Sequence, residues 1–346
     1  MERTNILVLF GGESSEHEVS VASAKNVVNA IDSHKYNIAL AYINESGQWY
    51  LIENFDQYND ETKTKQLLPH LGEKRFSITG SEETISADVI LPILHGKNGE
   101  DGSVQGLAQL LHIPIVGCDV TASSIGMDEL ASKEIVASQG VPIVPYVTHR
   151  MGDAAQDFET ISSKLGHPLF VKPSRAGSSV GVSKVQDEQG LVAAIEEAHR
   201  HDKVVLIEKA IKARELEIAM LGTPPYHKVS GIGEIIPGEE FYSYDDKYSS
   251  TSHAQAKIPA DLPAETSEKI RAMAKTIYES LGCSGLARID FFMDESGQIY
   301  FNEINTLPGF TDISMYPKLW QQEGTSYTEL IDLLISDALN NATINA

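Results

Sequence analysis

The alternation of apolar and polar positions along the chain predicts an α/β protein. Short apolar runs are typical of buried strands, whereas apolar residues three or four positions apart predict helices that pack on a sheet. The two patterns alternate along the chain. Strands are expected at 5–10, 35–42, 88–94, 113–116, 169–172, from 182 and at 204–207, and helices at 19–31, 103–111, 127–139, 154–165 and 188–199.

The rest of the chain carries strands near 215–221 and 230–236, helices at 263–281 and 327–339, and a hairpin. A length of 346 residues, of which 42% are hydrophobic, predicts two or three domains with ample core. We place their boundaries at 1–125, 126–211 and 212–346, with residues 208–211 as a hinge. Residues 53–84 are polar and are expected to be irregular.

The hairpin at 286–304 is the stretch with the most chemistry. Its strands, 286–293 and 298–304, are joined by the turn residues 294–297. A four-residue loop would set Glu303 opposite Arg288. Because side chains alternate along a strand, one face is expected to carry Arg288, Asp290 and Phe292 from the first strand and Phe301, Glu303 and Asn305 from the second.

Two carboxylates and an amide oxygen on one patch of sheet predict a magnesium site. Mg²⁺ takes oxygen ligands and shares them with substrate phosphates, and an adjacent guanidinium can stabilise negative charge on a reacting group. The alternative is a solvated hairpin face with incidental ion pairs. The apolar flanks and the turn at 305–309 favour the metal site.

Three other segments are candidates for ligand contacts, and each has a plainer interpretation. The Gly/Ser loop 174–181 follows a strand and would let backbone N–H groups reach phosphates, or it is an ordinary turn. Lys172, just before it, points away from the packed face. Residues 241–248 place aromatics in a polar stretch, as in a lid over a ligand or an exposed loop. Glu16 and His17 could simply cap a helix.

The charge and the cysteines narrow the possible partners. A formal net charge of −22 argues against nucleic acid or an anionic membrane as a partner. Two cysteines, Cys118 and Cys283, make no disulfide framework and suit a reducing compartment. We expect no signal peptide and no spanning helix, because no apolar run approaches about 20 residues. The sequence therefore predicts a cytoplasmic protein without a membrane partner.

Several motifs together resemble the D-alanine–D-alanine ligases of the ATP-grasp family. They are GGESSEHEVS at 11–20, HGKNGEDGSVQG at 95–106, VKPSRAGSSVGV at 171–182, LIEKAI at 206–211, EFYSYDDKY at 240–248, ARIDFF at 287–292 and NEINTLPGFTDIS at 302–314. The resemblance runs nearly end to end. It implies a three-domain ATP-grasp fold with an N-terminal open parallel-sheet domain, in the α/β class, and a homodimer.

The resemblance also implies roles for individual residues. Asp290, Glu303 and Asn305 would hold two Mg²⁺ ions, or Mn²⁺ in their place, on the phosphates of ATP. Lys172 and Lys247 would contact the phosphates. Adenine and ribose would be held by Glu208, by Glu215 and by the backbone of Lys209, Ala210 and Ile211. Phe241 and Phe292 would pack on the adenine. Arg288 and the Gly309 N–H would form an oxyanion hole. Glu16 would hold the ammonium group of the first substrate, and Ser178 and Tyr248 would be hydrogen-bonded to Glu16. His95 would line the subsite of the first substrate, and Ser314 would receive the carboxylate of the second.

The implied chemistry joins two D-alanine molecules for peptidoglycan precursor synthesis. The γ-phosphoryl group of ATP passes to the first D-alanine carboxylate, and the second amine then displaces phosphate. Relatives use D-lactate or D-serine as second substrate, and Tyr248 within Tyr244-Asp245-Asp246-Lys247-Tyr248 favours D-alanine. A ligase of another acid and amine, or a silent nucleotide-binding relative, is disfavoured by the intact motifs.

One residue departs from the family pattern. Glu129 stands where a phosphate-contacting lysine is usual, and a carboxylate there opposes a triphosphate. Lys133, one helical turn later, could compensate. We therefore expect weakened ATP affinity with retained chemistry.

Overall fold

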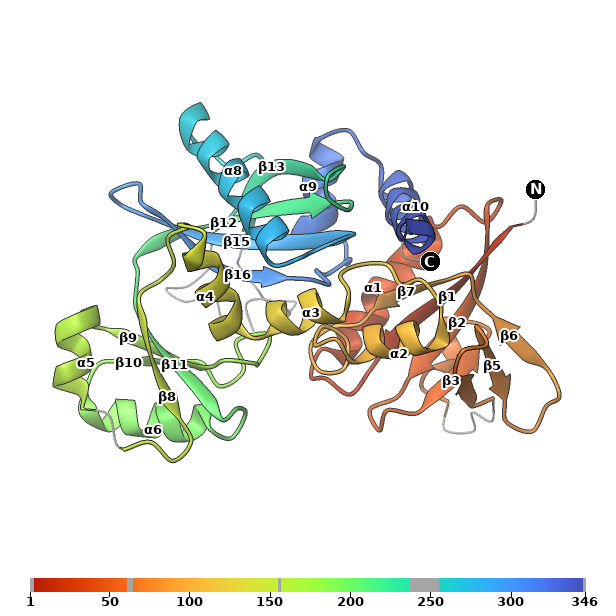
Figure 1. The fold of residues 1–346 in the computed structure, drawn as a ribbon, viewed down its shortest axis with the longest axis horizontal. Coiled ribbons are helices and arrows are strands. Elements are labelled where there is room, and N and C mark those ends of the chain that lie inside the picture. The colour runs from red at the N-terminus through yellow and green to blue at the C-terminus, as the bar shows by residue number, and fades with distance from the viewer. Residues whose placement is uncertain (1–2, 61–64, 155–156, 237–254, 345–346) are drawn as a thin grey trace.

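The computed structural model describes residues 3–60, 65–154, 157–236 and 255–344. These residues form three main β-sheets, which come one after another along the chain (Figure 1). The predictions for Phe241, Lys247 and Tyr248 lie outside the described residues.

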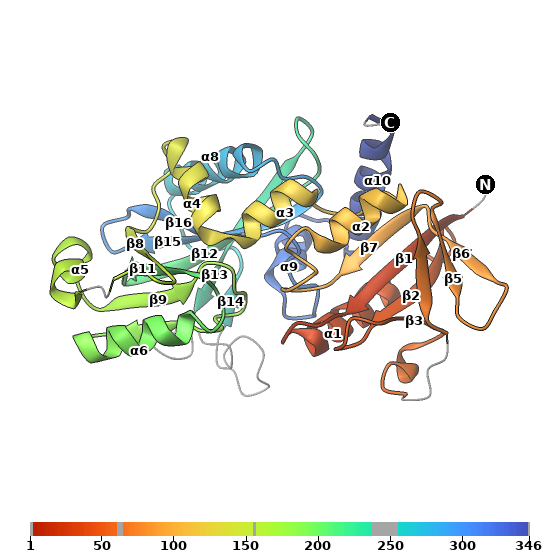
Figure 2. The same ribbon diagram turned by 60° about the horizontal axis from the view of Figure 1, so that its bottom comes forward.

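The first sheet has the order β3-β2-β1-β7, and β1 pairs parallel with both β2 and β7. It is the expected open parallel sheet with an antiparallel edge strand, β3. Alternate residues of β1 pack on helices on its two faces, α1 on one and α2 on the other (Figure 2). The bounds are β1 Thr4–Gly11, α1 His17–Ala30, β2 Tyr36–Ile43, β3 Trp49–Ile52, β7 Val89–Ile93 and α2 Ser103–Leu111.

The prediction that 53–84 is irregular is wrong over part of that stretch. After the short helix η1 (Phe55–Gln57), strands β4 (Leu67–His70), β5 (Arg75–Ile78) and β6 (Thr84–Ser86) form a small antiparallel sheet. The apolar side chains Leu67, Phe76 and Ile78 are buried against the first sheet and anchor it. Too few apolar positions mark these strands for the pattern to stand out in the sequence.

The second sheet, β10-β9-β11-β8, is antiparallel and has a hydrophobic core of its own. Helices α5 and α6 contribute to that core, and all its residues come from within 147–207. The elements are β8 Tyr146–Arg150, α5 Phe158–Leu165, β9 Leu169–Pro173, β10 Ser183–Val185, α6 Glu188–Ala198 and β11 Val204–Lys209. They form the lower left lobe of Figure 1.

The third sheet, β14-β13-β12-β15-β16, is antiparallel throughout. One face of β12 packs on helix α8, and its other face carries Glu215 and Glu217. The strands are β12 Ala213–Leu221, β13 Lys228–Ile236, β14 Gln255–Lys257, β15 Leu286–Asp294 and β16 Ile299–Asn305, and the helices are α8 Ala264–Ser280, α9 Met315–Gln322 and α10 Tyr327–Ile344. Helix α9 was not predicted.

The expected helix 127–139 is α4 (Glu129–Ser138), and a helix that was not predicted, α3 (Val120–Met127), precedes it. They are separated at Asp128, whose side chain accepts from the Ala131 N–H at 3.2 Å and from the Ser174 hydroxyl at 2.7 Å. An aspartate at this position caps a new helix, which is why the helical pattern is interrupted there. Both α3 and α4 contact β16.

The last helix, α10, packs against the N-terminal α/β unit. Leu330, Leu334 and Ile335 of α10 share one core with Val27 of α1 and Leu91 of β7. Helix α10 also ion-pairs across this contact, where Asp332 meets Lys35. The first and third sheets are therefore joined by a continuous core, whereas the second sheet is not part of it. The boundaries at 125 and 211 stay a prediction.

Candidate active site

The hairpin β15–β16 brings the predicted oxygen donors together, although not in the predicted register. Arg288 lies opposite Asn305, and Asp290 lies opposite Glu303. The predicted pairing of Glu303 with Arg288 is wrong for two reasons. The loop has three residues, because Asp294 N–H bonds to the Gln298 carbonyl at 3.0 Å, and a bulge at residue 302 adds one more position.

These two single-residue shifts add up to a two-residue shift, so the donors still face the same side. The bulge has a further effect on Phe301, which the sequence placed on the donor face. Phe301 is fully buried and packs on the opposite face with Phe291. The donor face therefore consists of Arg288, Asp290, Glu303 and Asn305.

Arg288 is clamped between two carboxylates. Its Nε and Nη2 donate to the two Asp290 oxygens at 2.8 and 2.7 Å, and its Nε lies 3.0 Å from Glu217 of β12. Burial opposes the charged guanidinium, but Asp290 and Glu217 outweigh it and raise the pKa of Arg288. Arg288 is therefore a fixed positive charge beside the oxygen donors. Glu217 was not predicted, although Glu215 and Glu217 alternate with buried Leu216 and Ile218 in the sequence.

The donor set suits a divalent cation that also binds a ligand. The Asn305 amide donates to Asp290 at 3.1 Å, which leaves its oxygen as the atom available to a metal. Within the described residues no three His, Cys, Asp or Glu side chains form a closed metal cage. Mg²⁺ usually takes one or two carboxylates and completes its shell with water and phosphate oxygens, so this set fits it.

Across the cavity, four buried charged side chains form a cluster that we call the charge quartet: Glu129, Lys133, Lys172 and Glu208. Lys172 lies 2.6 Å from Glu129 and 2.9 Å from Glu208. Lys133 lies 3.2 Å from Glu208 and 3.7 Å from Glu129, and its amine donates to the Asn302 carbonyl at 2.6 Å. The quartet has two positive and two negative charges and hence no net charge.

Burial and charge act in opposite directions on these groups. Burial would lower the pKa of Lys172, but Glu129 and Glu208 raise it above its ordinary value. Burial would raise the pKa of Glu208, but Lys133 and Lys172 lower it. Both residues are therefore held in their charged forms. At Glu129 burial dominates and raises the pKa of the carboxyl.

The Gly/Ser loop is fixed at its start and strained near its tip. The Ser174 carbonyl accepts from Glu129 N–H at 2.9 Å, and Arg175 holds Asp202 through two hydrogen bonds. Ser178 and Ser179 have φ of +54° and +59°, which non-glycine residues rarely adopt. A methyl group added at Gly177 would lie 3.5 Å from a carboxylate oxygen of Glu16. The loop therefore reaches the first α/β unit.

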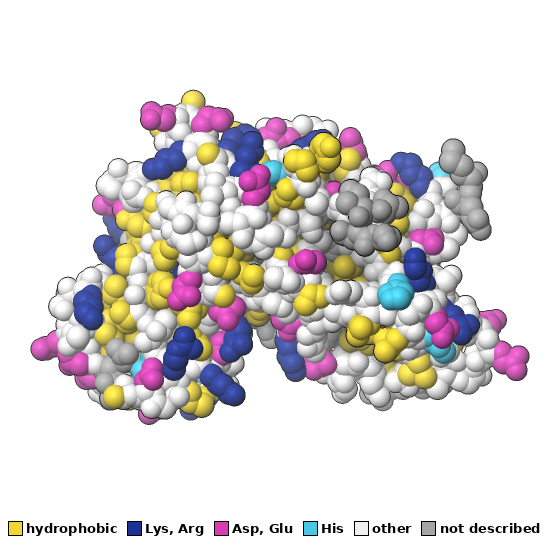
Figure 3. Space-filling model, in the orientation of Figure 1, with side chains coloured by type: hydrophobic (Ala, Val, Ile, Leu, Met, Phe, Trp, Pro, Cys, Tyr) yellow, Lys and Arg dark blue, Asp and Glu magenta, His cyan; other side chains and the backbone are white. Residues whose placement is uncertain are grey.

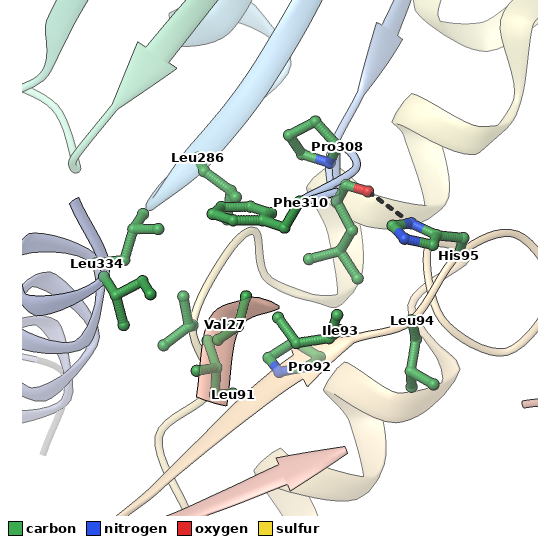
Figure 4. A pocket seen from close by; sticks show the side chains of 13 residues that line it. Val27, Leu91, Pro92, Ile93, Leu94, His95, Leu286, Pro308, Phe310 and Leu334 are labelled. Carbon is green, nitrogen blue, oxygen red and sulfur yellow. Dashed lines mark hydrogen bonds between the residues drawn. The ribbon is translucent and has the colours of Figure 1, made fainter. Parts of the chain in front are cut away.

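His95 lies at the junction between the first sheet and the segment after β16 (Figure 4). Its Nδ1 bonds to the Leu307 carbonyl at 3.1 Å and lies 3.8 Å from Glu100. Burial would lower the pKa of His95, but Glu100 and Glu16 outweigh it and raise it. Below the ring, Val27, Leu91, Phe310 and Leu334 line an apolar void of about 10 Å³. This packing fixes the turn that carries Gly309.

Gly309 and Ser314 approach each other in the same turn. A methyl group at Gly309 would lie 2.8 Å from the Ser314 Oγ, so only glycine fits there. The Ser314 hydroxyl oxygen accepts from Thr311 N–H at 2.9 Å.

A cavity of about 600 Å³ collects these groups between the second and third sheets and the edge of the first. Figure 3 shows a notch between the lobe of β8–β11 and the lobe of the first sheet. Most of the predicted site residues line the cavity: Glu16, His95, Lys172, Ser178, Glu208, Lys209, Ala210, Ile211, Glu215, Arg288, Asp290, Phe292, Glu303, Asn305, Gly309 and Ser314.

Among the predicted site residues that the structure describes, Lys133 does not line the cavity. Its side chain is fully buried beneath the cavity, with the amine 5.7 Å from the Phe301 ring centre. Glu100 and Asn302 line the cavity and were not predicted as site residues. Glu100 lies within the motif 95–106, where its contact with His95 could not be read from spacing alone. No helix in the described part of the chain is long and apolar enough to cross a membrane.

Two antiparallel sheets that enclose a cavity, one with lysine and the other with metal-type oxygen donors, define an ATP-grasp protein. The solved D-alanine–D-alanine ligase from Coxiella burnetii superposes on the whole chain and 96% of its own length, with a TM-score of 0.88 and 34% identity. The VanG D-Ala:D-Ser ligase from Enterococcus faecalis has a TM-score of 0.87 and 36% identity, over 97% of this chain and all of its own.

Sequence comparison specifies the family within that class. Residues 5–118 match the family described as D-ala D-ala ligase N-terminus, and residues 135–336 match D-ala D-ala ligase C-terminus. A D-alanine–D-alanine ligase from Sodalis glossinidius is 45% identical over 99% of this chain and 97% of its own. The chain belongs to the D-alanine–D-alanine ligase family, whose members are ATP-dependent and use divalent metal. The family and the fold expected from the sequence are confirmed.

Proposed function

We propose that this protein joins two D-alanine molecules to D-alanyl-D-alanine with conversion of ATP to ADP and phosphate. The observation that carries the proposal is the set of Asp290, Glu303 and Asn305 beside Arg288, facing Lys172 across one cavity in a member of this family. Such an arrangement combines metal ligands with fixed positive charge, which phosphoryl transfer to a carboxylate requires.

Each residue has a role in this proposal. Asp290, Glu303 and the Asn305 oxygen hold two Mg²⁺ ions, which neutralise phosphate charge when bound. Lys172 binds phosphate oxygens, while Glu208, Glu215 and the 209–211 backbone hold the nucleoside beside Phe292.

The amino acids bind at the other end of the cavity. Glu16 and His95 line the subsite of the first D-alanine, whose ammonium pairs with the Glu16 carboxylate. Ser178 orders Glu16 from the loop across the cavity, and the Ser314 hydroxyl receives the second substrate's carboxylate.

The reaction balances in two steps. An oxygen of the first D-alanine carboxylate bonds to the γ-phosphorus and ADP leaves. The second D-alanine amine then bonds to the acyl carbon, phosphate leaves, and the amine loses a proton. Arg288 and the Gly309 N–H stabilise the negative charge on the acyl oxygen during this attack.

The test is a coupled ADP-release assay with D-alanine alone, and with D-serine or D-lactate as second substrate. We expect the highest turnover with D-alanine alone. D-serine is the second candidate, because the VanG D-Ala:D-Ser ligase is as similar in fold as the D-alanine–D-alanine ligase from Coxiella burnetii. ADP release that required a different acid and amine would refute the proposal.

Asp290→Ala and Glu303→Ala should each reduce turnover to background while the circular dichroism spectrum is unchanged. Glu295→Ala is the matched control, since this exposed carboxylate lies at the tip of the same hairpin. Robust magnesium-dependent activity in either of the first two variants would contradict the metal roles. We also propose a homodimer, from the family resemblance; light scattering at working concentration would test it.

A further inference from the structure

The cavity is acidic, although a triphosphate is its proposed ligand. Among the described residues that line it, eight carry carboxylates, five are lysine or arginine, and one is His95. A cavity lined by an excess of one charge repels ligands of the same sign. A nucleotide without cations therefore meets unfavourable charge on entry.

Three of these basic side chains are paired with the protein's own carboxylates. Lys172 is only 11% exposed and contacts both Glu129 and Glu208. Arg288 is held by Asp290 and Glu217, and Lys212 pairs with Glu295 at 2.7 Å. These three side chains of the described lining therefore offer phosphate oxygens less positive charge than unpaired side chains would.

Glu129 is the residue that sets this balance at Lys172. It is the first residue of α4, and its backbone is fixed by the bond from Glu129 N–H to the Ser174 carbonyl. Its carboxylate is nearly buried, lines the cavity and lies 2.6 Å from the Lys172 amine. A neutral side chain in its place would give the quartet one net positive charge at the cavity surface.

We propose that Glu129 makes nucleotide binding depend on divalent cations. This inference rests on the proposed function. Because Glu129 offsets the charge of Lys172, cations held at Asp290, Glu303 and Asn305 compensate most of the phosphate charge, and Lys172 compensates less of it than an unpaired lysine would. Glu129 thus selects the metal complex of the nucleotide over the free nucleotide. It acts through Lys172 and is a specificity-determining residue.

The test is titration calorimetry of ADP and of a non-hydrolysable ATP analogue, each with excess Mg²⁺ and with EDTA. Wild-type protein should bind at least about 30-fold more weakly in EDTA. Glu129→Gln should gain about tenfold in affinity in EDTA, since one unit charge is removed near the phosphates, and should gain much less with Mg²⁺. Glu134→Gln, an exposed carboxylate on the same helix, should behave as wild type.

Equal gains for Glu129→Gln with and without Mg²⁺, or no gain in EDTA, would overturn the inference. Glu129→Lys should extend the gain in EDTA. If neither variant folds, the wild-type ratio decides, because equal affinity in Mg²⁺ and EDTA contradicts the inference without any substitution. Failure of the wild type to bind nucleotide under every condition would refute the proposed function as well, whereas binding with Mg²⁺ alongside an unchanged Glu129→Gln refutes only this inference.

Discussion

Removing one lysine from the charge quartet should unbalance the site and destabilise the fold. Lys133 is fully buried and is within 3.7 Å of both glutamates of the quartet. Lys133→Met keeps much of the side-chain volume but leaves Glu129 and Glu208 to share Lys172. Breaking a buried ion pair on one side costs about 3–5 kcal/mol, because a buried charge remains uncompensated. The loss of the bond to the Asn302 carbonyl adds to it.

A second substitution separates charge balance from packing. Lys133→Met/Glu129→Gln removes one charge of each sign and retains the Lys172–Glu208 pair at 2.9 Å. The double variant should therefore be less destabilised than the sum of the two single variants, with a coupling energy of about 1–3 kcal/mol.

The free energies of unfolding can be measured by urea titration followed by tryptophan fluorescence. Lys275→Met, an exposed lysine on α8, is the control for the substitution itself and should change stability by less than about 0.5 kcal/mol. Additive effects of Lys133→Met and Glu129→Gln, within about 0.5 kcal/mol, would refute the argument that the quartet is held together by charge balance.

Two further predictions concern the surroundings of the site. Burial would raise the pKa of Asp202, but Arg175 lowers it, so the ionised carboxylate stabilises the fold above about pH 4 and this stabilisation is lost as the pH falls through the lower folded-state pKa. Asp202→Asn should flatten the acid side of a urea-midpoint profile, and an unchanged profile would contradict this. Gly285→Ala should cost about 1–3 kcal/mol, because φ is +70° and the new methyl would lie 2.8 Å from the Gly117 backbone. Gly282→Ala, at φ of +71° with open space around the new methyl group, measures the cost of the backbone conformation alone. Equal losses of stability in the two variants would exclude a contribution from the clash at Gly285.

Prediction from the sequence was most successful where the alternation of apolar and polar residues and a recognisable motif indicated the same element. The hairpin could be located from alternation and from its turn residues, and the donors converge as predicted. The register could not be predicted, because a bulge at Asn302 and a three-residue loop leave no mark in the apolar pattern. Phe301 shows the consequence, since a single extra residue moves it from the donor face into the core.

The sequence also could not predict contacts between segments that are far apart in the chain. Glu129 was recognised as unusual from its position, but its pairing with Lys172 depends on the junction of α4 with Ser174. Lys133 was expected to reach the nucleotide from its helical spacing, yet spacing does not reveal that β16 covers it. Long-range placement of charged side chains follows from tertiary packing, which local patterns do not encode.

The separate core of the second sheet determines how the cavity can open. Sheets one and three share apolar packing through α10, whereas the apolar core of the β8–β11 lobe is its own and the contacts of Ser174 and Lys172 with Glu129 of α4 are polar. Rotation of that lobe about the connections near 145 and 209–213 would break those polar contacts but would disturb little buried apolar area. The oxygen donors, Glu16 and Ser314 then stay fixed to each other, while Lys172 and Ser178 travel with the rotating lobe. Closure is therefore a change in the distance between Lys172 and a stationary metal-binding face, and it can be followed with a donor–acceptor dye pair on exposed positions of α6 and α8.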